Sequence, residues 1–345
     1  MFSIWTHFGE PMDHASERDA SMSAVEPERV HRLECDVDWP PGHVAAYLVD
    51  GPEPVLVDAG GSEDHNAHEL RAGLDALGYE PSDVDHVVVT HPHTDHIGQV
   101  PALADAGARI YAPEPALEQL ERDPDDLATG VRETAIETGL DPEGIEKHIQ
   151  RAVESLERSR RLLPPERVDV AFEFDGAFDV GDHTFEPIHT PGHQVHHACF
   201  QVALDQASVL FSGDALIEPF RAAALNVGLD HGAFDAIDAF HRAFDRLEGR
   251  DVDRVYPGHG PVFDDFAGVL ETSRDRLDGT VASVERTLRE RGTSSPIGLT
   301  LARVDELEHP AVLLDTIGAL GYLEDRGRAT FDYDEDGVRR YRVVE

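Results

Sequence analysis

The chain has 345 residues, a length that suits one domain of about 250 residues with an appended unit. Its formal net charge is −40, from 69 acidic and 29 basic residues, and Lys147 is the single lysine. Such a surface repels nucleic acid at ordinary salt, whereas a hydrophobic share of 40% argues against a disordered acidic chain. We therefore expect a folded, halophilic protein, made for a cytoplasm so salty that the Debye length is roughly 3 Å.

The cysteine content and the length of the apolar runs indicate the cellular compartment of the protein. Cys35 and Cys199 are the only cysteines, so the sequence implies no disulfide scaffold and an intracellular, reducing setting. No run of about 18 apolar residues and no secretory signal pattern occur, which predicts a cytoplasmic protein without a membrane span. Residues 1–25 have the composition of a polar tail.

The N-terminal half alternates short apolar runs with amphipathic stretches. In chain order, the spacing predicts strands at 43–50 and 54–60, a helix at 64–77, a strand at 84–90, a helix at 97–107 and a strand at 109–113. Residues 115–163 differ, because their apolar positions keep helical spacing among many charges. We interpret them as a helical insertion and a candidate lid.

Strand patterns return in the next hundred residues. Four apolar runs, at 168–174, 183–190, 197–204 and 208–214, precede a predicted helix at 233–247 and a strand within 252–260. Strands that come in runs and then alternate with helices favour stacked sheets flanked by helices over one doubly wound sheet.

The last eighty residues form a different unit. Helical spacing predicts a helix at 268–291 and a second near 309–325, with 299–307 as an optional short helix, and 329–344 has the pattern of a hairpin with Asp336-Gly337 at its turn. This order is typical of a winged-helix module. The expected organisation is a tail at 1–25, a catalytic domain at 26–265 and a winged-helix-like domain at 266–345.

The stretch "THPHTDH" at residues 90–96 carries the strongest chemical signal. His91, His93, Asp95 and His96 follow a buried strand, and strand ends that enter loops are common places for sites. Imidazoles and carboxylates suit zinc and similar divalent ions. Alternation directs His91 and His93 to one side, while Asp95 and His96 can turn to another, which indicates two metals.

Three further motifs supply the same ligand chemistry downstream. His193 lies in "TPGHQVHH", Asp214 in "FSGDAL" and His259 in "YPGHG". Each follows a strand-like run and lies beside glycine, which permits close approach of the backbone to a site. With the first cluster, these residues make seven candidate ligands.

The ordered motifs His-x-His-x-Asp-His, Thr-Pro-Gly-His, Ser-Gly-Asp and Pro-Gly-His-Gly resemble those of the metallo-β-lactamase superfamily across residues 43–260. The resemblance implies an αββα sandwich and a binuclear centre. By this resemblance the first metal is held by His91, His93 and His193, the second by Asp95, His96 and His259, and Asp214 bridges both. His197 and Asp58, in "VDAGG", match positions that orient ligands in this family.

The implied mechanism needs no protein nucleophile. Two divalent ions, expected to be zinc with manganese and iron as alternatives, share a water whose pKa falls from 15.7 toward about 7, and the resulting hydroxide attacks a polarised carbonyl or phosphoryl group. Asp95 would orient that hydroxide or pass its proton to the leaving group. Asp95 and His197 are thus the candidate catalytic residues.

The leading function is hydrolysis of a small ester, thioester or lactone, similar to the glyoxalase II and β-lactamase-like protein 2 branches. A metal-dependent ribonuclease, a nucleic-acid-binding or scaffold protein, and redox chemistry at iron stay open. Residues 266–345 carry eleven arginines against sixteen acidic residues, the least acidic part of the chain. The expected partner is a small-molecule substrate; homodimerisation is left open.

Overall fold

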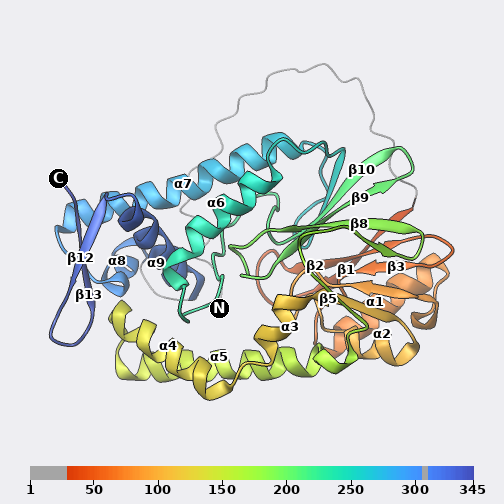
Figure 1. Ribbon diagram of the computed structural model, residues 1–345, viewed down its shortest axis with the longest axis horizontal. Helices are drawn as coiled ribbons and strands as arrows, with labels where there is room; N and C mark the ends of the chain where they lie inside the picture. Colours follow the sequence, from red (N-terminus) through yellow and green to blue (C-terminus); the bar gives the residue numbers. More distant parts are fainter. Residues whose placement is uncertain (1–28, 305–309) are drawn as a thin grey trace.

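The computed structural model describes residues 29–304 and 310–345, so the predicted tail at 1–25 lies outside the described residues. The part of the chain before residue 266 has four layers, in which helices cover the outer faces of two packed sheets (Figure 1). This is the αββα sandwich that the motifs implied. No described helix is long and apolar enough to cross a bilayer.

The first sheet contains six strands in the order β1-β2-β3-β4-β5-β6, with β1 to β3 antiparallel and β3 to β6 parallel. The strands are β1 (Val30–Asp36), β2 (His43–Val49), β3 (Val55–Val57), β4 (His86–Val88), β5 (Arg109–Pro113) and β6 (Val170–Phe172). Its outer face is covered by α1 (Asp64–Leu77) and α2 (Val100–Ala106), through buried side chains such as Leu74 and Leu103. Both helices end where predicted, at Gly78 and Gly107 in the left-handed conformation.

The second sheet has the order β11-β10-β9-β8-β7, and only the β10–β11 pair is parallel. Its strands are β7 (Phe178–Val180), β8 (His183–His189), β9 (Ala198–Leu204), β10 (Ala207–Gly213) and β11 (Arg254–Pro257). Phe185, Phe200 and Phe211 pack between the sheets against Tyr47 of β2. Burial of these large aromatic faces fixes the distance between the two sheets.

Helix α6 (Ala236–Leu247) covers the outer face of the second sheet because its apolar residues recur at helical spacing. Ile237, Phe240, Phe244 and Leu247 are all fully buried. They belong to a core that also holds Leu277 of α7 (Phe266–Arg291) and other buried residues of the C-terminal region. The outer helical layer and the C-terminal region therefore share one core.

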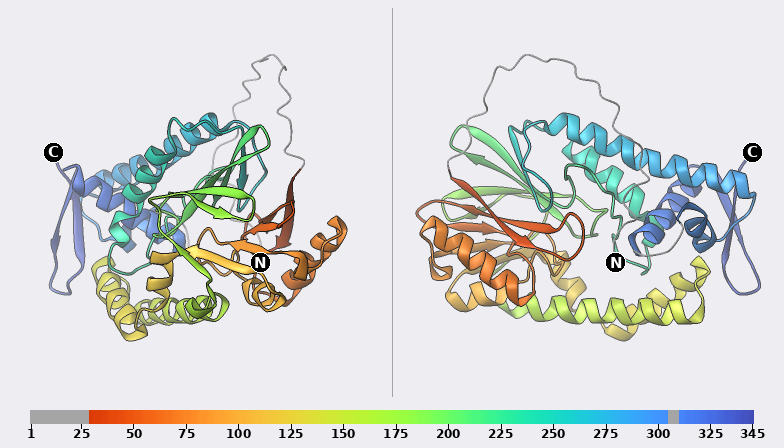
Figure 2. Two further views of the ribbon diagram at one scale, coloured as in Figure 1. Left: turned by 45° about the vertical axis from the view of Figure 1, so that its right-hand side comes forward. Right: turned by 180° about the vertical axis from the view of Figure 1, so that it is seen from behind.

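The segment predicted as a helical insertion contains α3 (Glu114–Leu120), α4 (Pro124–Thr138) and α5 (Pro142–Leu162). The Asp123 and Asp141 side chains cap α4 and α5 by accepting backbone N–H groups, and proline occupies the first turn of each helix. At their far end, α4 and α5 approach the C-terminal helices (Figure 2). Val131 and Ile317 lie in one buried cluster there, so the insertion is anchored at both ends.

The C-terminal region consists of α7 (Phe266–Arg291), α8 (Pro296–Arg303), α9 (Pro310–Asp325) and the hairpin of β12 (Ala329–Tyr333) and β13 (Arg339–Val343). Ser294 pairs with the buried Tyr341 and adds a third short edge to the hairpin. Helix α8 starts three residues before the predicted range 299–307, the end of which lies outside the described residues. The domain boundary at residue 265 stays a prediction.

Candidate metal centre

All seven predicted ligands lie just beyond the carboxyl ends of strands. The cluster His91 to His96 follows β4 of the first sheet, whereas His193, Asp214 and His259 follow β8, β10 and β11 of the second. The structure brings their donor atoms into three overlapping groups, each within 4.8 Å. Both sheets therefore contribute to one centre.

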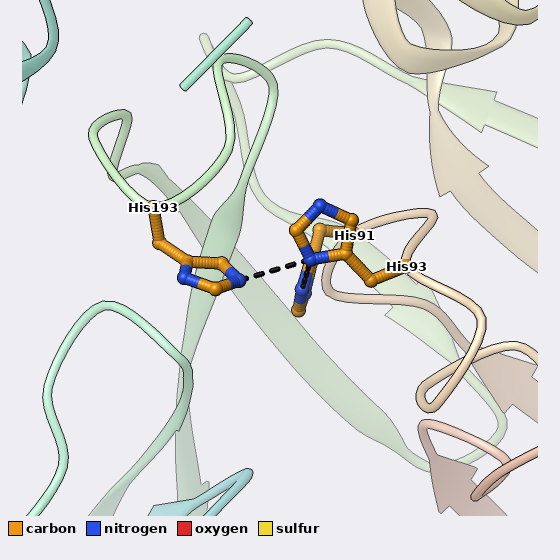
Figure 3. A group of neighbouring side chains, drawn as sticks. All are labelled: His91, His93 and His193. Atoms are coloured by element: carbon orange, nitrogen blue, oxygen red, sulfur yellow. Dashed lines mark hydrogen bonds between the residues drawn. The ribbon is translucent and has the colours of Figure 1, made fainter. Parts of the chain in front are cut away.

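The first group consists of three imidazoles whose nitrogens face one another (Figure 3). His93 Nδ1 lies 3.0 Å from His91 Nε2 and 2.9 Å from His193 Nε2. Burial, reinforced by His193, lowers the pKa of His93 to about 3, and burial also lowers the pKa of His91 and of His193. Neutral imidazoles with converging lone pairs are what a divalent metal binds.

The second group combines Asp95, His96 and His259. His259 Nε2 lies 3.4 Å from Asp95 Oδ2, and His96 Nε2 lies 3.9 Å from the same oxygen. Asp214 joins the two groups, because its Oδ2 is 3.2 Å from His193 Nε2 and 3.4 Å from His259 Nε2, while its Oδ1 is 3.3 Å from His96 Nε2. Asp214 thus lies between the two groups, and its role as a bridge between two metals stays a prediction.

Hydrogen bonds on the outer side of the centre orient the imidazoles. Thr90 donates its hydroxyl proton to Asp58 Oδ2 at 2.8 Å, so its oxygen accepts from His91 Nδ1 at 2.9 Å. His96 Nδ1 donates to Asp58 Oδ2 at 2.8 Å, and His259 Nδ1 donates to the His43 carbonyl at 2.6 Å. In the neutral form of each of these three imidazoles, the proton on Nδ1 leaves the lone pair of Nε2 directed inward.

Two buried atoms at the centre test whether a metal fits. Among the described residues, His96 Nε2 and Asp214 Oδ1 are buried and have no hydrogen-bond partner, although they face each other at 3.3 Å. Burial disfavours protonation of His259, but the Asp214 and Asp95 carboxylates outweigh it and raise the pKa of His259 to about 10. The carboxylates thus favour positive charge at the centre, and the donor set fits divalent cations.

Comparison with known proteins gives the family. The model of the metallo-beta-lactamase superfamily matches residues 39–259, which include all seven ligands. The chain belongs to the metallo-β-lactamase superfamily. The predicted class, a hydrolase of this superfamily, is confirmed at the level of the family.

Curated relatives of this superfamily member are about a quarter identical to it over the aligned residues. A Beta-lactamase-like protein 2 homolog of Caenorhabditis elegans is 26% identical over 63% of the chain, and the chain spans 56% of that relative. The Probable metallo-hydrolase YqjP of Bacillus subtilis is 25% identical over 72% of the chain and 77% of its own length. Atrochrysone carboxyl ACP thioesterase dmxR1 of Cryptosporiopsis is 26% identical over 60% of the chain and 44% of its own length.

A solved structure extends the likeness beyond the family match. The metallo-beta-lactamase family protein TTHA1429 of Thermus thermophilus superposes with a TM-score of 0.74 at 23% identity, over 91% of this chain and 98% of the other. At this identity the likeness shows the fold alone. Because 91% of the chain is more than residues 1–259 contain, the likeness includes part of residues 260–345.

The structure gives His197, a predicted catalytic residue of this superfamily member, a positioning role. Its ring is fully buried, and its Nε2 accepts the backbone N–H of Asp214 at 3.1 Å. The proton therefore lies on Nδ1, which donates to Thr190 Oγ1 at 2.7 Å. With both nitrogens engaged, His197 holds the Asp214 backbone in place, and of the two predicted catalytic residues only Asp95 is half-buried.

Sequence reasoning did not find Thr90, Thr190 or the structural use of His43. Thr90 is the first residue of the stretch THPHTDH and Thr190 the first residue of Thr-Pro-Gly-His, and this place in the motifs was their only signal. Gly258 is a further requirement of the centre, because a Cβ there would lie 2.5 Å from Asp214 Oδ1 and 2.6 Å from His96 Cε1. Only glycine permits that approach.

Proposed function

We propose that this chain is a binuclear metal-dependent hydrolase of small esters, thioesters or lactones. The observation that carries the proposal is the convergence of seven donor side chains whose outer hydrogen bonds direct lone pairs and carboxylate oxygens to one centre. Relatives named as atrochrysone carboxyl ACP thioesterases support thioesters as the first class to test.

In this proposal the protein's side chains hold the metals and orient the substrate and the attacking water. When bound, two divalent cations, which we expect to be zinc, would polarise the substrate carbonyl and lower the pKa of water. His91, His96 and His197 are fully buried, whereas His93 and Asp95 are half-buried, so substrate approaches from the side of His93 and Asp95. The Asp95 carboxylate is placed there to orient the attacking water and the leaving group.

Neither cysteine is available as an alternative nucleophile. Burial raises the pKa of Cys199 to about 12 and that of Cys35 to about 11. Both thiols are buried, and Cys199 Sγ donates to the Ser212 carbonyl at 3.3 Å. Protonated, inaccessible thiols do not attack acyl groups, which supports water activated at the cluster as the attacking group.

We further propose that the C-terminal region is a winged-helix-like unit of the β-lactamase-like protein 2 type rather than a glyoxalase II tail. The order of helices, the Ser294–Tyr341 pair and the hairpin support this comparison. Arginines of the hairpin are paired with carboxylates, as in Arg340–Asp334 at 2.7 Å and Arg339–Glu137 at 2.7 Å. Such pairing disfavours the nuclease and nucleic-acid-binding alternatives.

Elemental analysis and a substrate panel test the proposal. Protein purified in high potassium chloride without chelators should carry about two metal ions per chain and cleave members of a panel of p-nitrophenyl esters, thioesters and lactones, but not single-stranded RNA. His193→Ala and Asp214→Ala should each lower kcat/KM by at least about a thousandfold and leave the circular dichroism spectrum unchanged.

His231→Ala is the matched control, because His231 is exposed and paired with Glu133 far from the motif loops in sequence. It should leave activity and metal content unchanged. Full activity of Asp214→Ala would contradict the proposal, and RNA cleavage abolished by Asp214→Asn would replace it with the nuclease alternative.

A further inference from the structure

A small cavity of about 80 Å³ opens beside the ligand Asp95. Its lining includes Thr94 and Asp95 of the ligand loop, Trp39, Glu63 and Arg158. It is far smaller than the roughly 300–1,000 Å³ of pockets for drug-sized ligands. The proposed mechanism uses none of its walls except Asp95.

The first wall is the turn between β1 and β2. Val37 N–H donates to the Gly42 carbonyl at 3.1 Å, and Gly42 N–H donates to the Trp39 carbonyl at 2.7 Å, so a closed loop presents the indole. Trp39 is 43% exposed, an unusual state for so large an apolar ring. The first residue of β2, His43, accepts the proton of His259 Nδ1 on its carbonyl and ties this loop to the centre.

The second wall is the start of α1, and a buried carboxamide holds it to the first. Asn66 is 1% exposed, and its Nδ2 donates to the Asp36 carbonyl at 2.8 Å at the end of β1. Its Oδ1 accepts the Glu63 N–H at 3.2 Å. The third wall, α5 with Arg158, is fixed to the ligand loop because Ser159 Oγ donates to the Pro92 carbonyl at 3.0 Å.

We propose that this cavity receives the acyl substituent of the substrate and that Trp39 is a specificity-determining residue for it. The inference rests on the proposed hydrolase function. A cavity of this volume, adjoining the ligand that faces the opening, fits a short acyl chain and excludes the longer arm of a thioester leaving group. The indole face supplies the apolar contact that a short hydrocarbon chain recognises.

The charges around the cavity favour an uncharged chain. Asp36, Asp38 and Glu63 join Asp95 in the lining, against Arg158 and one histidine. A substrate with a carboxylate on its acyl chain would meet like charges at close range, which disfavours binding even where salt screens longer distances. We therefore expect short neutral acyl chains to be preferred over acyl chains that end in a carboxylate.

A kinetic series tests the subsite. Wild-type protein should hydrolyse p-nitrophenyl butyrate with a higher kcat/KM than either p-nitrophenyl acetate or the hemisuccinate. Trp39→Ala should lower kcat/KM for butyrate roughly tenfold, mainly through KM, with a smaller effect on acetate, and Trp39→Phe should restore most of the loss.

Leu301→Ala is the control, because Leu301 is 51% exposed on α8 and lines no part of the cavity. It should leave the series unchanged. The inference is wrong if Trp39→Ala lowers kcat/KM equally for acetate and butyrate, or if the hemisuccinate is the best substrate.

A binding measurement separates this inference from the hydrolase proposal. Trp5→Phe leaves Trp39 as the only tryptophan of the chain, so its fluorescence reports on the cavity. Pentan-2-one, a neutral mimic of a butyryl group, should change the emission saturably, whereas succinate should not. The same response in Trp5→Phe/Asp214→Ala would uphold the subsite even if no hydrolysis were found. If the enzyme is active but pentan-2-one does not change the Trp39 emission, the subsite inference is wrong and the hydrolase proposal stands.

Discussion

At the scale of single residues, one carboxylate organises a large part of the centre. Asp58 is 2% exposed and accepts three hydrogen bonds, from the Thr90 backbone, the Thr90 hydroxyl and His96 Nδ1. Through Thr90 it also sets the ring of His91. Its φ of 58° lies in the left-handed region, a strain that recurs at functional sites.

Asp58→Asn tests this organisation. Asparagine tolerates the left-handed backbone but loses one acceptor oxygen and the charge, so the rings of His91 and His96 should be oriented less firmly. We expect the affinity for metal to fall about 10–100-fold, measured by competition with a chelator. Asp75→Asn, an exposed change on α1, is the control. Equal affinities in the two variants would contradict the role given to Asp58.

Gly258 gives a second prediction, in which no ligand is removed. A methyl group in Gly258→Ala would displace the side chains of Asp214 and His96, so metal content should fall and kcat/KM should drop at least about tenfold. Elemental analysis and a substrate titration measure both effects. Gly176→Ala introduces the same methyl where no atom lies within 4 Å, and it should retain metal and activity.

The residues of the centre differ in how far the sequence could predict them. All seven candidate ligands follow from ordered motifs, because residue type and spacing can be read from short stretches of sequence. The roles of Thr90, Thr190 and His43 depend on which backbone and ring atoms meet across separate loops. No short sequence pattern predicts these contacts between loops, and they can be seen only in the folded structure.

At the scale of secondary-structure elements, a half-buried acid, Asp315, links α9 to the loop that follows β10. Asp315 accepts the Ala224 backbone N–H at 3.0 Å, and burial, against the opposing effects of that bond and of Arg303, raises the pKa of Asp315 to about 6. The folded protein thus holds this proton more tightly than an unfolded chain, whose aspartates titrate near about 3.9. Stability from this group is complete below about pH 4 and is lost as the pH rises through about 6.

Asp315→Asn should remove this pH dependence. The amide oxygen can still accept the Ala224 N–H, so this hydrogen bond is kept. Because only the wild type loses stability as Asp315 ionises, the free energy of unfolding of the variant minus that of wild type should increase between about pH 4 and 6, by at most about 3 kcal/mol. Above about pH 6 the difference should stay constant. Denaturant titrations at constant high salt measure it. Asp325→Asn, exposed on the same helix, controls for the loss of one charge. A difference that does not change with pH would disprove the linkage.

The elements themselves were predicted unevenly. Long apolar runs such as β2 and amphipathic helices such as α1 and α6 matched, because their burial pattern repeats with a clear period. Two strands were missed. In β1 only Leu33 and Cys35 are buried between charged neighbours, and β7 has three residues, too few for an alternation to show.

At the scale of the whole molecule, a formal charge of −40 means that the folded chain repels itself strongly unless salt screens its surface. We expect the folded, active form to need molar potassium chloride, where the Debye length is roughly 3 Å, and to lose structure near 0.1 M, where it is about 10 Å. Circular dichroism and activity across this range measure the effect. Sorbitol does not screen charge, so replacing the salt with sorbitol should not restore the folded state. Full activity in about 0.1 M salt would contradict the halophilic assignment.

The division of the ligands between the two sheets also has a consequence for biosynthesis. Four of the predicted ligands lie before residue 97, but the last is at residue 259, on the other half of the sandwich. A nascent or half-assembled chain therefore offers only fragments of a coordination shell, and tight ion capture must wait until the halves have docked. Metal binding would then be a late step of folding, and it would stabilise only those molecules in which the two halves have already docked correctly.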